Sequence, residues 1–388
     1  MQAVLLGWKM YELTHDPLFL GFIGLTAAIP ALSLALYAGY LVDRSRPIVV
    51  YRRVIEGALL SGLVLLVSQL PQAGLNNHQQ VLALFLASFI AGIARGFSQP
   101  SVYAIVPRII PREDLQRASA WMTSALQIAR ISGPALGGFL FGWLGMPVAA
   151  SVLCVFLVLA LCNVFLLKVR IDPPAKPAKH KPVLDELLAG ARYVFKHRIL
   201  FPALTLDMVA VLFGGVTALL PIFASDILMV GPKGLGVLRA APAVGAVLTS
   251  YWMTRKDLKA QAGTYLFSSV AGFGISVLVF GLSHNFILSL VALALSGAFD
   301  SVSMVIRTSA VQLSSPDSMR GRISAVNSIF IGSSNEIGEF ESGMAAKLMG
   351  TVPSVLFGGA VCLITVVAAA VVSPSLRKLH LGQLKAEE

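Results

Sequence analysis

Acidic residues occur inside long apolar stretches of the second half of this chain, where a charge is costly. They are Asp207, Asp300, Glu336, Glu339 and Glu341. A carboxyl group removed from water favours its neutral form, so it can bind and release a proton under physiological conditions. These acids are therefore candidates for proton coupling, and a static ion pair is the alternative for each of them.

Arginines also occur inside apolar stretches, in both halves of the chain. Arg95 lies near the middle of one apolar stretch, and Arg130 lies at a similar estimated depth in the next. An isolated charge at that depth usually faces an internal cavity. The two arginines would make a cavity in the first half cationic, which suits an anionic substrate; structural pairing is the alternative. In the second half, Arg239 and Glu336 share an estimated depth and could pair.

The elements that must position these residues are membrane-spanning helices. Hydrophobic residues make up 56% of the 388 residues, charged residues make up 13%, and the mean hydropathy is +0.79. Many apolar runs approach or exceed the roughly 20 residues that an α-helix needs to cross a bilayer, so the sequence predicts an all-α membrane protein. The predicted helices are residues 1–13, 18–42, 54–70, 80–107, 115–141, 147–167, 200–227, 235–253, 262–282, 286–307, 323–349 and 352–372.

The first of these helices is too short to cross a bilayer. Either its beginning is missing, through a mis-assigned or truncated start at Met1, or this variant has a half-helix. Basic residues are concentrated in alternate loops, and such loops face the cytoplasm. With helix 1 completed, both termini are expected to be cytoplasmic.

A basic, proline-rich connection divides the predicted helices into two groups of six. The expected parts are an N-terminal transmembrane half at 1–169, a cytoplasmic linker at 170–198, a C-terminal transmembrane half at 199–375 and a cytoplasmic tail at 376–388. Within the linker, apolar residues at helical spacing predict an amphipathic helix over 184–195, on the inner membrane surface.

Composition and motifs also argue against several function classes. The net charge of +11 follows the positive-inside pattern and has no aromatic-rich basic groove beside it, so we expect no nucleic-acid partner. The three cysteines lack metal-ligand spacing, and there is no phosphate-binding loop, dinucleotide fingerprint or nucleophile elbow. We expect no metal, no cofactor and no enzymatic activity, and an ion or solute gradient as the energy source.

One short motif closes the second predicted helix at its cytoplasmic end. It consists of Gly39, Asp43, Arg44 and Arg46. The glycine permits close helix approach, the aspartate could pair with a neighbouring helix end, and the arginines could lock a closed state. This predicts a gating loop; an ordinary polar loop is the alternative.

A second set of small residues predicts close helix packing. Gly133, Pro134, Gly137 and Gly138 combine a kinking proline with small residues four positions apart, and Gly96 follows the arginine of the preceding apolar stretch. A hinge and simple packing are both consistent with this pattern.

Taken together, these motifs resemble the major facilitator superfamily, and within it the branch that includes the enterobactin exporter and macrolide efflux proteins. The closer likeness lies in residues 231–242, 320–327 and 334–343. The resemblance implies two six-helix halves with twelve transmembrane helices, a monomer in the bacterial inner membrane, and alternating access coupled to protons. It also implies gating by the loop motif, proton or substrate handling at Arg95, and an antiporter-type motif at Gly133 to Gly138. The loop departs from the family pattern, because Arg46-Pro47 replaces the usual glycine-basic pair.

The first functional prediction is an exporter of a small organic compound, with a siderophore or a lipophilic drug as the leading substrate. A lysolipid flippase, a solute importer of the same fold and a truncated, non-transporting homologue are the alternatives. A membrane enzyme would need a polar catalytic pair near a membrane face, such as a histidine with an aspartate, and no histidine is placed in that way.

Overall fold

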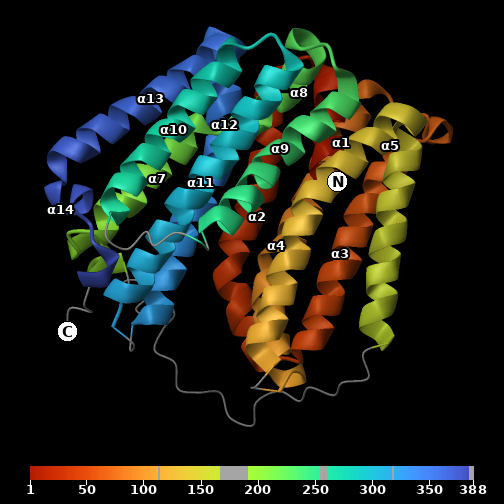
Figure 1. The fold of residues 1–388 in the computed structure, drawn as a ribbon. Coiled ribbons are helices and arrows are strands. Elements are labelled where there is room, and N and C mark those ends of the chain that lie inside the picture. Colours follow the sequence, from red (N-terminus) through yellow and green to blue (C-terminus); the bar gives the residue numbers. More distant parts are fainter. Residues whose placement is uncertain (112–113, 167–190, 254, 256–260, 317–318, 384–388) are drawn as a thin grey trace. The chain divides into compact units, whose positions relative to one another are not determined.

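The computed structural model describes residues 1–111, 114–166, 191–253, 255, 261–316 and 319–383. These residues are almost entirely helical and contain no strand, which confirms the all-α class (Figure 1). Most of the predicted linker lies outside the described residues, including residues 184–190 of its predicted amphipathic helix. Residues 191–196 are helical.

The chain divides into two compact units, which are described separately. The first unit contains α1 to α5 together with Val230–Val237, and the second contains the remaining helices. The helices of the first unit are α1 (Gln2–Thr14), α2 (Pro17–Arg44), α3 (Pro47–Ser68), α4 (Asn77–Ile109) and α5 (Leu115–Leu166).

Local sequence signals start the long helices of the first unit. Asp16 caps α2 by accepting a hydrogen bond of 3.0 Å from the backbone N–H of Leu18. A capping box between Asn76 and Gln79 starts α4. Each cap satisfies backbone N–H groups that the first turn of a helix leaves without a partner.

The two helices predicted over 115–141 and 147–167 form one helical run, α5, with a kink. Gly145 has a φ of 80° and a ψ of 172°, outside helical geometry, so two helices meet at this residue. A positive φ of this size is accessible to glycine at little cost. The predicted connection between the two helices is therefore reduced to a single-residue bend.

The predicted helix over 200–227 is not continuous, which corrects the sequence-based expectation. It consists of α7 (Leu200–Gly214), a 3₁₀ turn at Thr217–Leu219, α8 (Leu220–Ile222) and a π-helical turn at Phe223–Ile227. The break falls at Gly214 and Gly215, because paired glycines weaken a helix and Gly215 takes an extended backbone with a ψ of 94°.

The rest of the second unit consists of long helices and a short C-terminal segment. These are α9 (Gly231–Met253, whose first residues belong to the first unit), α10 (Ala262–Leu282), α11 (Phe286–Ser314), α12 (Arg320–Met349), α13 (Thr351–Val372) and α14 (Pro374–Arg377).

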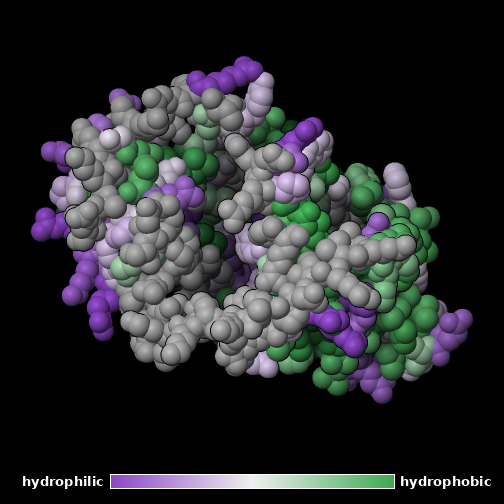
Figure 2. Space-filling view, turned by 90° about the horizontal axis from the view of Figure 1, so that it is seen from below, coloured by the Kyte–Doolittle hydropathy of each residue, from purple (hydrophilic) through white to green (hydrophobic). Residues whose placement is uncertain are grey.

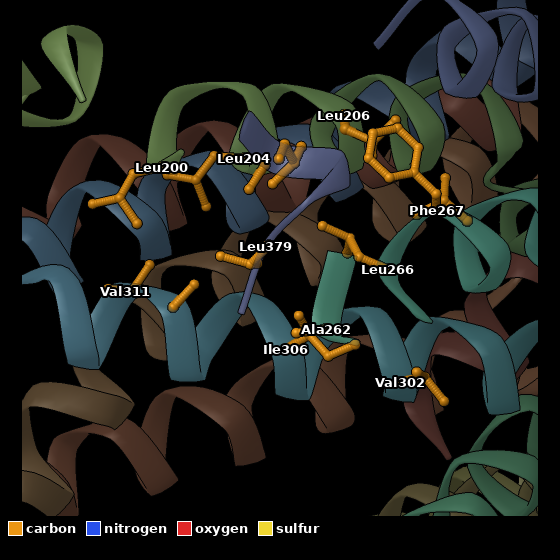
Figure 3. Close-up of a cluster of buried hydrophobic side chains, with 14 of the residues drawn as sticks. Leu200, Leu204, Leu206, Ala262, Leu266, Phe267, Val302, Ile306, Val311 and Leu379 are labelled. Carbon is orange, nitrogen blue, oxygen red and sulfur yellow. The ribbon is translucent and has the colours of Figure 1, made fainter. Parts of the chain in front are cut away.

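A cluster of apolar side chains forms the core of the second unit. It joins Leu200 and Leu204 of α7 to Leu266 of α10 and Ile306 of α11 (Figure 3). Leu379 packs into the same cluster, and its carbonyl accepts a hydrogen bond of 3.1 Å from the N–H of Gly263. The start of the predicted cytoplasmic tail is thus part of this core.

Seven helical segments in the described part of the chain are long and apolar enough to cross a membrane. Their apolar side chains are often exposed: Leu82, Ile287 and Ile364 are 67%, 69% and 67% exposed. In water such exposure would be unfavourable, whereas lipid accommodates it. In a space-filling view from below, many hydrophobic side chains lie at the surface of the protein, with hydrophilic side chains beside them (Figure 2).

Candidate functional site

A buried ion pair joins α7 and α11 in the second unit. Arg307 Nη1 lies 2.7 Å from Asp207 Oδ2, and the two side chains are only 5% and 7% exposed. Arg307 Nε also donates a hydrogen bond of 3.3 Å to the hydroxyl of Ser303, which in turn hydrogen-bonds Asp207. Because charges at this depth are stabilised only by such partners, Arg307 is held in place by one carboxylate and one hydroxyl.

A small pocket opens beside this ion pair. Asp207, Asp300, Ser269 and Ser303 supply its polar surface. The remaining lining residues are Ala210, Val211, Val270, Phe273 and Phe299. The pocket has room for roughly one water molecule. It therefore brings together two acids that lie far apart in the sequence, Asp207 and Asp300.

The sequence reasoning missed Arg307 as part of this site. It predicted a helix over 286–307, with Arg307 at its end. In the structure α11 continues for two turns beyond Arg307, to Ser314, so the predicted end of this helix was wrong. The available signal was the spacing of Asp300 and Arg307, which are two turns apart and therefore share one helix face.

Arg239 of α9 and the glutamates of α12 lie elsewhere in the second unit. Arg239 interacts electrostatically with Glu339, which lies about one turn beyond Glu336 along α12. The pairing of Arg239 with Glu336 stays a prediction.

The break after α7 contacts the same part of α12. Ser342 donates a hydrogen bond of 2.9 Å to the carbonyl of Gly215, a group that the interrupted helix leaves without its usual partner. A Cβ atom on Gly338 would lie 2.8 Å from the carbonyl oxygen of Leu212, so the two backbones approach closely. Sequence reasoning named neither Gly215 nor Ser342, although the Gly214-Gly215 pair was a visible signal for a break.

Arg95 of α4 and Arg130 of α5 are exposed residues within membrane-spanning segments of the first unit. Next to Arg95, Gly96 is buried, and a Cβ there would lie 3.0 Å from the carbonyl oxygen of Ala31 of α2. The glycine thus brings α4 close to α2 and fixes the position of the turn that carries the arginine.

The predicted gating loop lies between α2 and α3. Gly39 has open space around its Cα, and Arg46 is exposed at the start of α3. The side chains of Asp43 and Arg44 lie outside the described part of the chain, so the gating role of this motif stays a prediction.

The glycine motif of α5 contacts two neighbouring segments of the first unit. Cβ atoms at Gly133 and Gly137 would lie 3.2 Å and 3.1 Å from atoms of Met1, at the start of α1. A Cβ at Gly138 would lie 2.5 Å from the Pro232 carbonyl oxygen and 2.6 Å from Gly236 Cα, at the start of α9. These residues permit close helix contact. Pro134 lies within the same helical run. A hinge role for the motif stays a prediction.

Among the described residues, no group of three or more His, Cys, Asp or Glu side chains could hold a metal ion. In the described part of the second unit, ionisable groups lie together in the Asp207–Arg307 ion pair with Asp300 and in the interaction of Arg239 with Glu339. Such groups can bind or release protons and can bind charged solutes.

Solved structures identify this helical arrangement as the major facilitator fold, the fold of a class of membrane transporters. A POT family transporter in complex with 5-aminolevulinic acid superposes with a TM-score of 0.76 over 97% of this chain and 93% of that chain, at 13% identity. The xylose transporter XylE of E. coli, in an inward-open conformation, gives a TM-score of 0.66 over 95% and 93% of the chains, at 12% identity. At such low identity these likenesses establish the fold alone.

The family follows from the sequence profile of transmembrane secretion effectors, which matches residues 1–387. The chain belongs to this family of the major facilitator superfamily and is a multi-pass membrane protein. It is similar to the enterobactin exporter EntS of Shigella boydii and to that of Escherichia coli, with 25% identity over 252 residues in each. Those matches cover 63% of this chain and 58% of each exporter, so the chain spans about 58% of the length of these relatives.

Proposed function

We propose that this transporter exports a small organic anion across the bacterial inner membrane by alternating access and uses protons as the coupling ion. The likeness to enterobactin exporters supports a siderophore as the substrate. A lipophilic drug is the second candidate. The observation that carries the anionic preference is the exposure of two arginines, Arg95 and Arg130, within membrane-spanning helices.

The reasoning begins with the cost of an exposed charge inside the membrane. A guanidinium group that faced hydrocarbon would be strongly unfavourable, so an exposed arginine in a span faces an aqueous space. Arg95 and Arg130 lie on different helices of the same unit, and both would add positive potential to that space. Positive potential in a low-dielectric surrounding attracts anions and repels cations.

Proton coupling is supported by the carboxyl groups of the second unit. The fold class uses ion gradients, and buried acids in spans are the groups that can carry protons. The candidates are Asp207, Asp300, Glu336 and Glu339. In this proposal the first unit binds the anion and the second unit binds the proton, and the protein works as a monomer among membrane lipids with both termini in the cytoplasm.

Three alternatives make different predictions for the same assay. A lysolipid flippase would move a lipid, and a solute importer would run in the opposite direction. A truncated, non-transporting homologue would fold and move nothing. An enzymatic role has no support from the family or from the relatives.

The test is uptake into inverted membrane vesicles energised with a proton gradient. Catecholate siderophores, macrolides and cationic dyes would be offered to vesicles that contain the chain from Met1 or a form with a longer first helix. We expect uptake of the siderophores that an uncoupler abolishes. Uptake of cationic dyes alone would contradict an anionic preference, and uptake that ignores the uncoupler would contradict proton coupling.

Arg95→Ala tests the residue basis of the preference. Because a hydrogen bond to a charged group contributes about 1.5–3 kcal/mol, we expect the apparent KM for an anionic substrate to rise roughly tenfold or more. Arg53→Ala is the matched control, since Arg53 is 78% exposed and pairs locally with Glu56. If Arg95→Ala spares anionic substrates and impairs only cationic ones, the cationic-cavity proposal is wrong.

A further inference from the structure

The cluster around Arg307 contains more acidic than basic groups. Asp207 binds Arg307 directly at 2.7 Å, and Asp300 also interacts electrostatically with this arginine. Asp207 and Asp300 are electrostatic neighbours as well. With every group ionised, two carboxylates would therefore share one guanidinium, and the cluster would carry one uncompensated negative charge.

Among the described residues, the other helices that surround this cluster supply no positive charge to it. From α10 the pocket receives Ser269, Val270 and Phe273, none of which is charged. From α13 the thiol of Cys362 lies near Asp207 and donates a hydrogen bond to the Val270 carbonyl. Arg239 of α9 interacts with Glu339 of α12 instead. A net charge in a buried cluster is unfavourable, so the cluster favours binding one cation, and a proton is the smallest.

The contacts indicate which carboxyl group takes that proton. Asp207 accepts the contact from Arg307 and a hydrogen bond from Ser303, which both stabilise a carboxylate. Asp300 forms no ion pair within the described part of the chain, although it lines the pocket beside Asp207. The hydroxyl groups of Ser269 and Ser303 line the same pocket, so a single water molecule there would connect Asp300 to polar groups.

Two aromatic rings limit this pocket. Phe273 and Phe299 form part of its wall. A Cβ atom on Gly272 would lie 2.7 Å from the ring of Phe299, and one on Gly214 would lie 2.6 Å from the ring of Phe273. These glycines let the rings pack closely around the carboxyl groups, which keeps the pocket small and favours a proton over a larger, hydrated ion.

We propose that Asp300 is the proton carrier of this transporter. Arg307 is the positive charge whose pairing with the two aspartates changes when Asp300 is protonated. The inference rests on the proposed function and names the residue that performs the coupling. When a proton binds, one O–H bond forms on the Asp300 carboxylate, and Arg307 pairs with Asp207 alone. When the proton leaves, that bond breaks and Asp300 competes with Asp207 for Arg307. The state of Asp300 thereby alters the contact between α7 and α11, so that proton binding is linked to helix position.

The test measures the proton directly and does not depend on a substrate. Infrared difference spectra of the purified protein in lipid nanodiscs would be recorded between acidic and alkaline buffer, in potassium salts. We expect the wild type to lose a protonated-carboxyl band as the buffer becomes alkaline. The band should be absent in Asp300→Asn, retained at a shifted position in Asp300→Glu, and unchanged in Asp226→Asn, which alters an exposed acid. Monodisperse elution of each variant confirms folding.

An unchanged band in Asp300→Asn would overturn the assignment, whatever the vesicle assay shows. Loss of the band on adding sodium at constant pH would identify a metal cation as the ligand and would also overturn the assignment.

A transport measurement completes the test. The rate of a step that needs one proton changes by up to about tenfold per pH unit, and in Asp300→Asn this change should fall to less than about twofold. Proton-independent transport by the wild type, with the infrared result as expected, would contradict the proposed function and leave Asp300 as a proton site.

Discussion

Arg307 of α11 and Asp207 of α7 join two helices of the second unit through a buried contact of 2.7 Å. The two residues are far apart in the sequence, and neither has another oppositely charged side chain as close in the described part of the chain. The pair therefore holds α7 and α11 in one register, and the nearby Asp300 gives Arg307 a second carboxylate with which it can interact.

The two members of this pair should differ in their effect on stability. Arg307→Met leaves two carboxyl groups without a counter-charge, and we expect a loss of about 3–5 kcal/mol. Asp207→Asn should cost less, because Asp300 can then neutralise Arg307. The loss in Arg307→Met should grow in alkaline buffer, where two carboxyl groups would have to stay protonated.

Thermal unfolding in detergent across a pH series would measure both variants of the pair. The control is Arg53→Gln, which removes an exposed pair with Glu56 and should change stability by about 0–1 kcal/mol. Equal losses for Asp207→Asn and Arg307→Met would show that Asp300 does not replace Asp207.

Ser342 should stabilise the break after α7. Ser342→Ala removes the donor to the Gly215 carbonyl, which leaves a partly buried acceptor without this bond, and we expect a loss of about 1–3 kcal/mol. Thermal unfolding again provides the measurement. Ser33→Ala is the matched control, since Ser33 donates to a carbonyl of its own helix and is exposed, and its removal should have little effect.

Gly138 should tolerate no larger residue. In Gly138→Ala the added methyl group would lie 2.5 Å from the Pro232 carbonyl oxygen, so α5 and the start of α9 would have to separate. We expect a loss of about 1–3 kcal/mol, the usual range for overpacking. Gly57→Ala serves as the control, because its nearest neighbour would lie at an ordinary 3.5 Å and alanine favours the helix. A Gly138→Ala protein as stable as the wild type would show that α5 and α9 can move apart without cost.

The orientation in the membrane can be tested with single cysteines. In a background without Cys154, Cys162 and Cys362, we expect His284→Cys to react with a membrane-impermeant maleimide in intact cells. Arg377→Cys should react only after permeabilisation, because the basic loops are predicted to face the cytoplasm. Both positions are exposed, so the difference would report sidedness and not burial. The opposite pattern would invert the predicted topology.

The sequence by itself determined the helical membrane class and many helix limits. The predicted helix over 262–282 coincides with α10, and the helix predicted from Phe286 begins at that residue, where Asn285 caps it. Apolar length, loop charge and caps are local properties, and in lipid each helix must satisfy its own backbone hydrogen bonds. For this reason a linear pattern was sufficient to predict these elements.

Only the tertiary structure decided which residues meet. The apolar pattern of the sequence placed Asp207 and Asp300 in membrane-spanning helices. The pairing of Asp207 with Arg307, however, depends on how α7 packs on α11. The break at Gly215 likewise depends on Ser342, which lies far along the chain and accommodates the freed carbonyl. Such contacts are set by the rotation and crossing of packed helices, and the spacing of residues along one helix does not contain that information.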